Sequence, residues 1–483
     1  MKNISIWQDT INDGKIYETL KKNIDVDILI IGGGVTGCNT FYQFKDDKRK
    51  IALVEKNRLG SGASSRSSAK LTFLQEDIYT KLKFNFGKDK SYLYYSSQKE
   101  ALNIIRKLIE KENIDCDFKS SKSYLYTMDT KNIKKIEQEK KLISSFGEKA
   151  ISIKKLPNNI KVESGFYVDN TYLFHPLKYI KGIIKKSISP NHNVYENTKI
   201  IKIEKYDNYY KCYTEKNIIK AKYVVIALHY PYFLFPYLMP LKVYLEKSFL
   251  CCSKQDNCFD FNAINIEKPL NSMRYYKDYL LTVSSSSNLA FASNSKKMVD
   301  DLLENNNIDN YEYLWSNYDL ITLDHLPLIG FIDKNMIIAT GYNTWGNTNS
   351  VIASTLIKDL INHKANVYKA LFNPKRCFNK EKLINYPLNI YSNLYSFISS
   401  KMNKNKSFYN ANPYFTRIDG RKIAIYKDEK GIDHIVYNKC PHLGCSLTFN
   451  KVEKTWDCPC HGSRFDLDGK CIMGPSNYNI SYK

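Results

Sequence analysis

The chain has little that would carry it out of the cell or into a membrane. Its first ten residues, MKNISIWQDT, lack the basic start, apolar core and small-residue cleavage site of a signal peptide, so export is not expected and a cytoplasmic location is. The longest uncharged run, from Tyr223 to Leu241, is as long as a membrane span but contains Pro231, Pro236 and Pro240. We therefore predict a strand followed by a turn-rich aromatic loop there, and membrane association is not predicted.

Acidic residues are scarce relative to basic ones. The chain has 49 Asp and Glu against 72 Lys and Arg, which gives a net charge of +23. Such an excess can attract nucleic acid or an anionic surface. The lysines are spread along the whole chain, however, and no basic helix or arginine-rich arm concentrates them. We therefore expect no specific nucleic-acid partner, although the charge could steer an acidic electron-transfer partner.

Histidine is scarce as well, with eight in 483 residues. A mononuclear iron site of the oxygenase type needs two His and a carboxylate around one metal. Six of the histidines form no close pair in the sequence, at positions 175, 192, 229, 325, 363 and 434. An oxygenase of that kind is therefore not expected.

The other two histidines lie with four cysteines in two short clusters near the C-terminal end, CPHLGC and CPCH. Cys440 pairs with His442 in the first cluster, and Cys458 pairs with His461 in the second. A structural zinc site usually has two Cys close together and then two His close together. Here each cluster mixes the two ligand types, which favours a two-iron cluster whose thiolates hold one iron and whose imidazoles hold the other; zinc is the weaker alternative.

This ligand set has an electrostatic consequence. Two ferric ions, two sulfides and two thiolates sum to zero charge, whereas four thiolates would leave a charge of −2. The mixed cluster therefore accepts an electron more readily, with a potential of about −150 to +300 mV. Such a cluster should receive electrons from a more reducing centre.

The stretch from about residue 413 to the C-terminal end resembles a Rieske domain, which implies a small all-β domain with a 2Fe-2S cluster on the four ligands named above. The resemblance also implies a disulfide between Cys445 and Cys460; two free thiols are the alternative in a reducing compartment. Ser463 matches a serine that donates a hydrogen bond to a cluster sulfur. Phe465 stands where a tyrosine commonly supplies a second such bond, so we expect a potential below the top of the range.

A second motif lies near the N-terminal end. An apolar, β-branched run, Val26 to Ile31, directly precedes a Gly-x-Gly-x-x-Gly pattern and an expected helix. Glycines in that pattern let a dinucleotide pyrophosphate approach the backbone at the helix start. The expected cofactor-binding residues of this turn are Gly32, Gly34, Val35, Thr36 and Gly37. The pattern by itself does not distinguish NAD from FAD.

Three further segments point to a dinucleotide. A second strand, IALVE, ends in Glu55, which should bind the adenosine ribose hydroxyls. The small and hydroxyl-bearing stretch from Gly60 to Thr72 includes Ser61 and Ser68, and suits contact between backbone amides, phosphate and a flavin ring. Far downstream we predict a strand over 336–340, a glycine-rich loop and a helix from about residue 349. Expected cofactor contacts in that segment are Gly341, Gly346, Asn347 and Thr348.

Together these segments resemble the FAD-dependent oxidoreductases of the D-amino-acid-oxidase and glycine-oxidase superfamily, over about 26–361. The resemblance implies an α/β fold, with a Rossmann-like FAD-binding domain and an interleaved α+β substrate domain, followed by the Rieske domain. The expected organisation is an N-terminal extension over 1–24, the oxidoreductase over 25–373, a connector over 374–407 and the Rieske domain over 408–483. Within the oxidoreductase, the FAD-binding pieces are expected at about 25–82, 157–231 and 320–373.

The implied function is oxidation of an amine or amino-acid-like small molecule at FAD, followed by transfer of single electrons through the 2Fe-2S cluster to an external acceptor, an acidic redox protein or a quinone.

Amino-acid oxidases of this superfamily usually place an Arg just before the segment that reads HLPLIG here, and this chain has none there. Arg274 is a candidate substitute contact, with a surface or interdomain ion pair as the favoured alternative; the catalytic residues are unknown. An NADH-linked reductase would need a second fingerprint, which is absent after Gly37. A non-catalytic flavin and iron-sulfur redox sensor stays open.

Overall fold

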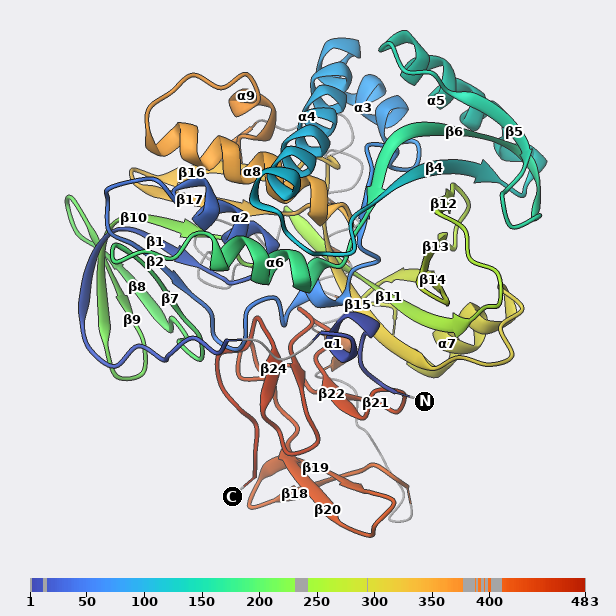
Figure 1. Cartoon of the computed structure of the whole chain (residues 1–483). Coiled ribbons are helices and arrows are strands. Elements are labelled where there is room, and N and C mark those ends of the chain that lie inside the picture. Colours follow the sequence, from blue (N-terminus) through green and yellow to red (C-terminus); the bar gives the residue numbers. More distant parts are fainter. Residues whose placement is uncertain are drawn as a thin grey trace.

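The computed structural model describes residues 2–11, 15–230, 242–292, 294–376 and 411–482, with positions 387, 390, 391, 395 and 398–400. In this part of the chain, two large sheets with their helices form the body, and two small antiparallel sheets form a C-terminal projection (Figure 1). The predicted fold class, α/β with a small all-β region at the C-terminal side, is confirmed. The loop predicted after Tyr230 and most of the predicted connector lie outside the described residues.

The first sheet supplies the nucleotide-binding framework. Its centre is β1 (Ile24–Ile31), which pairs in parallel with β10 (Ile218–Ile226) and with β2 (Ile51–Val54), and β17 (Met336–Thr340) extends it in parallel from β10. The four strands therefore end at the same edge of the sheet, where ligands of such folds bind.

β7 (His192–Tyr195) extends the parallel core from β2, whereas β8 (Lys202–Lys205), β9 (Tyr210–Tyr213) and β16 (Leu328–Asp333) are antiparallel to their neighbours. Three helices pack together over it: α2 (Val35–Gln43), α6 (Pro176–Lys185) and α8 (Gly346–Ile361). The strand predicted over 336–340 is present, and the following helix begins at Gly346, three residues earlier than expected.

The second sheet has nine strands and lies beside the first. Its strands are β3 (Lys70–Leu71), β4 (Lys119–Thr127), β5 (Ile151–Lys155), β6 (Lys161–Leu173), β11 (Val243–Lys254), β12 (Phe261–Asn265), β13 (Asn271–Tyr276), β14 (Tyr279–Asn288) and β15 (Tyr313–Thr322). Its helices are α3 (Ile78–Phe86), α4 (Lys88–Glu112), α5 (Ile133–Ser145) and α7 (Ser295–Glu304).

Short helical segments complete the body: α1 (Ile6–Asp9), α9 (Lys369–Phe372) and the 3-10 turns η1 (Ala63–Arg66) and η2 (Thr130–Asn132). None of the helices in the described ranges combines the length and the apolar character that a membrane crossing needs.

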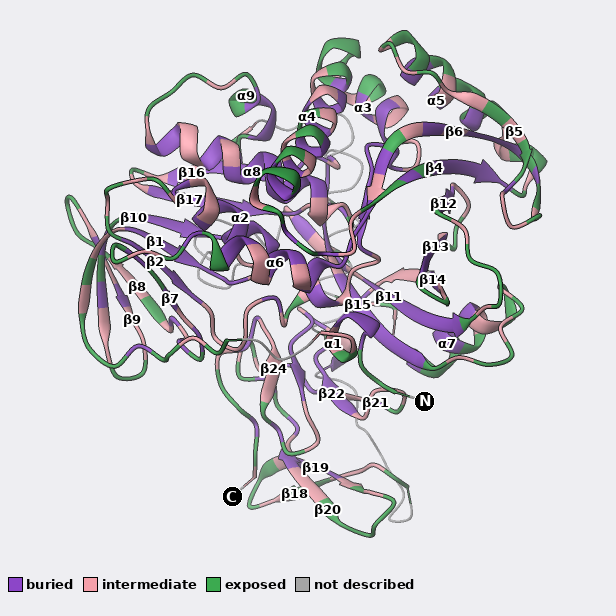
Figure 2. Cartoon of the chain, in the orientation of Figure 1, coloured by how far each residue is buried: buried purple, intermediate pink, exposed green. Residues whose placement is uncertain are grey.

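The C-terminal projection has two layers. Its outer sheet consists of β18 (Tyr414–Ile418), β19 (Arg421–Lys427) and β20 (Asp433–Tyr437). Its inner sheet consists of β21 (Thr448–Asn450), β22 (Thr455–Asp457), β23 (Arg464–Phe465) and β24 (Cys471–Met473). Trp456, Phe465 and Leu447 are fully buried between them. Figure 2 shows that the layer nearer the body is mostly buried or intermediate, and that the outer layer is mostly intermediate or exposed, with buried residues in β19.

A buried group of charges joins the projection to the body, and Glu453 is one of its two carboxylates. Glu453 accepts hydrogen bonds from Arg66 of η1 at 3.1 Å and from Arg464 at 2.6 Å. It also accepts from the backbone N–H of Ser316 in β15 at 3.1 Å and from the hydroxyl of the same residue. Burial alone would raise the pKa of Glu453, but the two guanidinium groups hold it well below its usual value.

Asp457, directly before Cys458, is the second carboxylate. It accepts from Arg464 Nε at 3.1 Å and from the hydroxyl of Tyr318 in β15 at 3.0 Å. Lys247 of β11 lies 3.4 Å from it, and both side chains are nearly inaccessible to solvent. Buried charges must find their partners or pay a large desolvation cost, so this network fixes one position of the projection on the body.

Removing the charge of Glu453 should therefore loosen the projection. In Glu453→Gln, Arg66 loses its carboxylate and Arg464 keeps only Asp457, so we expect the free energy of unfolding of the C-terminal region to fall by about 3 kcal/mol or more. The measurement is denaturant unfolding followed by the visible circular dichroism of the iron-sulfur centre.

Glu429→Gln is the matched control, because Glu429 pairs with Lys454 on the exposed outer layer of the same region. Loss of this exposed ion pair should lower the free energy of unfolding by less than about 1 kcal/mol. Equal effects of the two substitutions would contradict a special role for the buried network.

Candidate functional site

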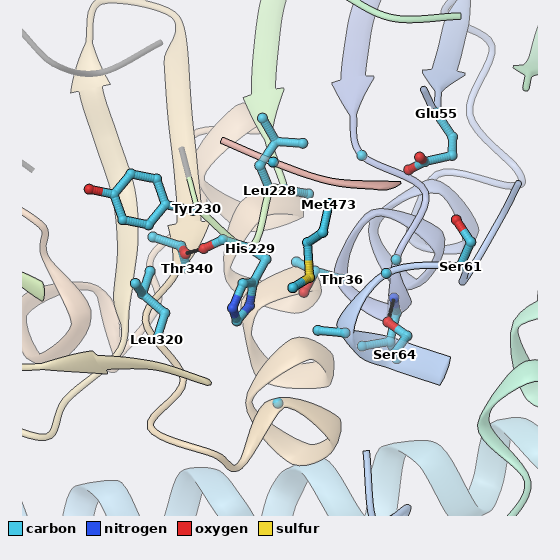
Figure 3. Close-up of a pocket in the computed structure, with 18 of the residues that line it drawn as sticks. Thr36, Glu55, Ser61, Ser64, Leu228, His229, Tyr230, Leu320, Thr340 and Met473 are labelled. Atoms are coloured by element: carbon cyan, nitrogen blue, oxygen red, sulfur yellow. Dashed lines mark hydrogen bonds between the residues drawn. The ribbon is translucent and has the colours of Figure 1, made fainter. Parts of the chain in front are cut away.

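A cavity lies where four parallel strands of the first sheet, β1, β2, β10 and β17, end (Figure 3). Gly32 follows β1, Glu55 follows β2, Ala227 follows β10 and Gly341 follows β17, and all four line the cavity. The cavity thus sits at the carboxyl edge of the sheet because parallel strands bring these four chain positions together.

The glycines of the fingerprint shape this cavity in different ways. Gly32 has a φ of +112°, and a Cβ on it would lie 2.5 Å from the carbonyl oxygen of Ala227. A Cβ on Gly37 would lie 1.8 Å from the carbonyl oxygen of Gly32, so this glycine permits the close contact of helix and strand. A Cβ on Gly34 would meet only Ser64 Oγ, at 3.2 Å, and Gly34 lines the cavity. These features fit a backbone cradle for a dinucleotide pyrophosphate.

Glu55 and Ser64 hold the loops around the cradle. Both oxygens of the Glu55 carboxylate accept backbone N–H groups, from Gly33 at 2.8 Å and from Asn57 at 2.9 Å. Ser64 Oγ accepts the N–H of Val35 at 2.9 Å, at the first residue of α2. Ser64 was not singled out from the sequence, because it lies in a run of small polar residues where no single serine stands out.

The structure places most of the expected cofactor residues around this cavity. Those that line it are Gly32, Gly34, Val35, Thr36, Glu55, Ser61, Gly341, Gly346 and Asn347. Gly37 lies behind the cradle, and Ser68 and Thr348 line a second, adjoining cavity instead. Lining residues that the sequence did not indicate include Thr198, Leu228, His229 and Tyr230.

The second cavity lies over the second sheet and adjoins the first. The two share five lining residues: Ser67, Asn317, Asp319, Thr344 and Asn347. Its wall is rich in hydroxyl groups, and two ionisable groups, the buried Lys70 and the partly exposed Asp319, also line it. A cavity of this kind beside a nucleotide site can hold a small polar molecule against the end of the cofactor.

Lys70 is buried, with 5% of its surface exposed. Its Nζ donates to the hydroxyl of Ser272 and lies 5.5 Å from the centre of the Trp345 ring. No ion pair to a carboxylate is formed by Lys70 among the residues that the structure describes. Burial, together with the nearby charge of Arg274, lowers the pKa of Lys70 to about 7.

Asp319, at the other side of the second cavity, has the opposite shift. Burial and the neighbouring Glu246 raise the pKa of this carboxyl to about 7, and Asn317 donates a hydrogen bond to it at 3.0 Å. The two cavities therefore meet at a group that exchanges a proton near neutral pH.

Arg274 lines neither cavity. It is buried, and its guanidinium donates to the carbonyl oxygens of Ala69 at 2.5 Å, Ser68 at 3.3 Å and Phe174 at 3.3 Å. Its donors are thus used to hold the segment that carries Ser68 and Lys70. This placement argues against the expected substrate contact.

The C-terminal projection closes part of the first cavity. Ile472, Met473 and Gly474, from β24 and the residue after it, line it together with the nucleotide-binding loops. Figure 3 shows the side chain of Met473 beside His229 and Thr36. The ring of His461 lies 5.7 Å from that of Tyr230, centre to centre. The predicted iron-sulfur region therefore forms part of the wall of the predicted flavin cavity, and we call this contact the shared wall.

The four predicted cluster ligands are brought together at the ends of two loops. The thiols of Cys440 and Cys458 are buried and hydrogen-bonded to each other, which lowers the pKa of Cys440 and raises that of Cys458. The rings of His442 and His461 lie 5.0 Å apart, centre to centre. Nδ1 of His461 is buried without a hydrogen-bond partner, as an iron ligand would be. This donor set fits a 2Fe-2S cluster of the Rieske type.

Two further features surround these ligands. Cys445 and Cys460 form a disulfide that ties the two loops. The hydroxyl of Ser463 is hydrogen-bonded to the Cys440 thiol and accepts the backbone N–H of Ser476 at 2.8 Å. Phe465 is fully buried next to Trp456 and offers the centre no hydrogen bond.

Comparison with known proteins agrees with this geometry. A family model described as FAD dependent oxidoreductase (DAO) matches residues 27–360, and one described as Rieske [2Fe-2S] domain matches residues 400–482. The chain belongs to this family of FAD-dependent oxidoreductases and carries a C-terminal Rieske domain. It is thus an FAD-dependent oxidoreductase whose cofactors are FAD and a 2Fe-2S cluster.

Individual proteins are similar over much of the chain. YhfW of Bacillus subtilis, named as a Rieske 2Fe-2S iron-sulfur protein, is 29% identical over 97% of this chain and 95% of its own length. Gamma-glutamylputrescine oxidoreductase of Escherichia coli is 23% identical over 74% of this chain and 88% of its own. The structure of glycine oxidase from Geobacillus kaustophilus superimposes with a TM-score of 0.64 at 18% identity, covering 73% of this chain and 99% of that one. This last likeness shows the shared fold.

Two glycine substitutions should separate cofactor binding from folding. Gly34→Val adds a side chain toward the cradle with little else in its way, so we expect a folded protein that retains the iron-sulfur spectrum and loses FAD. Gly37→Val drives a side chain into the backbone of Gly32, so we expect loss of the folded protein. Flavin content, the Rieske spectrum and thermal unfolding check both. Stoichiometric FAD in Gly34→Val would contradict this placement of the nucleotide.

Proposed function

We propose that the enzyme oxidises an amine that also carries a carboxylate, such as an amino acid, and delivers the electrons one at a time through its own Rieske domain to an external acceptor. The observation that carries this proposal is the shared wall: β24 of the Rieske domain lines the cavity that the nucleotide loops form. Bound FAD would accept the hydrogen and the two electrons of the C–H bond next to the substrate nitrogen, which leaves an imine, and the cluster would pass the electrons on singly.

The lining of the second cavity supports an amine that carries a carboxylate as the substrate. Lys70 is a buried ammonium group without a carboxylate partner in the described ranges, in a cavity whose other lining groups, apart from the Asp319 carboxyl, are hydroxyl, amide and apolar groups. A substrate carboxylate would supply the missing negative charge and two hydrogen-bond acceptors. Lys70 thus offers the contact that an arginine usually provides in this superfamily, from β3 instead of the segment before HLPLIG. The amine class also agrees with the named activity of the E. coli relative.

Asp319 supports the same assignment through its proton. An amine is oxidised as the free base, so the substrate ammonium group must lose a proton first. The Asp319 carboxyl, with its pKa raised to about 7, is ionised enough at neutral pH to accept one and basic enough to hold it. Asn317 donates to this carboxylate and keeps it at the junction of the two cavities.

These two groups give a pH dependence of defined sign. Lys70 is cationic below about pH 7 and loses its charge above it, so affinity for a carboxylate should fall as pH rises. Asp319 is protonated below about pH 7, so proton acceptance should fall as pH falls. For a carboxylate-bearing amine, the two trends predict a bell-shaped profile of kcat/KM centred near neutral pH.

The proposal is tested with an anaerobic panel of amines with and without a carboxylate. We expect at least one amino acid to bleach the flavin and then the cluster. In Lys70→Met, the KM for that compound should rise roughly 10- to 100-fold through loss of a charge-assisted hydrogen bond, while FAD content stays normal. An amine that lacks the carboxylate is the matched control, and its weaker oxidation should not change.

Two results would overturn the proposal. A panel in which no amine or amino acid reduces the flavin would remove the substrate class. An equal effect of Lys70→Met on substrates with and without a carboxylate would show that Lys70 serves the cavity structure and not the carboxylate.

A further inference from the structure

The Rieske domain presents its two histidines to different surroundings. His461 lies against Tyr230 on the flavin side. His442 lines an open hollow together with Cys440, the turn between β18 and β19, and the loop between β20 and β21. The electron proposed to enter beside His461 thus has a second edge of the centre, at His442, from which it can leave.

The hollow beside His442 is strongly basic. We name it the His442 face and define it by Arg417, Arg421, Lys422, Lys439, His442 and Leu443. Three of its four cationic residues are exposed, and Leu443, with 39% of its surface exposed, adds an apolar point beside the histidine. Asp419, in the same turn, is the acidic residue nearest in sequence, so positive charge dominates there.

The arginines of this face differ from those of the rest of the chain. The sequence has nine arginines, and six of them form an ion pair with a carboxylate, at positions 49, 58, 66, 106, 376 and 464. Arg274 is buried on backbone carbonyls. Arg417 and Arg421 pair with no carboxylate of the described residues; their donors reach the Gly420 carbonyl at 3.3 Å and the Tyr437 hydroxyl at 3.1 Å.

The other cations of the face are equally uncompensated. Lys422 donates to the hydroxyl of Ser446 at 2.9 Å, and Lys439 has no ion pair within the described ranges. Elsewhere in the same domain, Lys427 pairs with Asp433 and Lys454 with Glu429. General lysine enrichment would not place the unpaired arginines at the exposed edge of the iron-sulfur centre. Charges held in place without partners are what an oppositely charged protein surface recognises.

We infer that the His442 face is the docking surface for an acidic electron-transfer protein, which takes one electron from the reduced centre without making or breaking a bond. This inference rests on the proposed function, because it takes the cluster as the exit of the electrons. The occupant is a protein with a carboxylate-rich patch around its own redox centre. Leu443 and Pro441 provide the apolar contact at the middle of a basic rim, the arrangement of a small transient interface.

The test compares charge reversal on this face with equal charge reversal elsewhere. Arg417→Glu/Arg421→Glu changes the face, and Lys134→Glu/Lys135→Glu makes the same net change on α5, on the far side of the body in Figure 1. The probes are two soluble c-type cytochromes of similar potential, one acidic and one basic. Binding is measured by calorimetry at low and high salt with redox-inactive, zinc-substituted forms.

We expect the parent protein to bind the acidic cytochrome more tightly than the basic one, and more weakly at high salt. Arg417→Glu/Arg421→Glu should weaken the acidic complex at least about tenfold, and the α5 control should leave it within about twofold. The milder Arg417→Gln/Arg421→Gln should give an intermediate loss, which guards against a folding defect of the charge-reversed protein.

Electron transfer provides the second readout. The reaction starts from chemically reduced protein without substrate. In Arg417→Glu/Arg421→Glu, oxidation of the centre by the acidic cytochrome should slow at least about tenfold, as binding does. Oxidation by a small uncharged acceptor should not change. Because no substrate is used, this arm reads the docking face even if electrons from the flavin never reach the cluster. Failure of the proposed function would show only in a separate arm that starts from substrate.

Three outcomes would overturn the inference. The first is a parent protein that does not prefer the acidic cytochrome. The second is equal weakening by the two charge reversals, which would reduce the effect to net charge. The third is binding of a short-chain quinone in the hollow with no affinity for either cytochrome, which would assign the face to a small-molecule acceptor.

Discussion

The buried charges around Glu453 and Asp457 are the constraint on which the rest of this enzyme depends. Both carboxylates belong to the Rieske domain, and their partners come from the flavin loop through Arg66, from the second sheet through Lys247, and from the Rieske domain itself through Arg464. Such a network adds little net stability compared with apolar packing, because every charge has lost its water. Its contribution is to make one arrangement of the two domains strongly preferred.

The charge network also positions the cofactor sites, because several residues of these sites are close neighbours of the network residues in the sequence. Asp457 directly precedes Cys458, and Arg464 follows Ser463, so the network holds both sides of the second ligand loop. Arg66 lies in the small-residue segment that also carries Ser64, which accepts a hydrogen bond from the first residue of α2, and Lys70, which lines the second cavity. One set of ion pairs therefore positions the iron-sulfur ligands, the pyrophosphate cradle and the candidate substrate contact relative to one another.

Much of this could be predicted from local sequence patterns. The strand before the glycine fingerprint, the strand over 336–340 and the convergence of Cys440, His442, Cys458 and His461 each follow from residues close together in the chain. The shared wall and the charge network could not be predicted, because Arg66 and Glu453 are 387 positions apart and neither belongs to a motif. The local sequence shows only that two carboxylates, Glu453 and Asp457, precede the second ligand box, and it gives no indication of their partners on the body. Arg274 shows the opposite case: its residue type suggested a substrate contact, whereas its burial and its four carbonyl acceptors favour a structural role.

We propose that each chain passes electrons from its own flavin to its own cluster across a fixed interface. The direct measurement is anaerobic stopped-flow absorbance, in which the flavin is reduced rapidly and the reduction of the cluster is followed over a wide range of protein concentration. A fixed interface predicts a first-order rate that does not depend on protein concentration. A rate that rises in proportion to protein concentration would mean that electrons pass between molecules, and it would contradict this account.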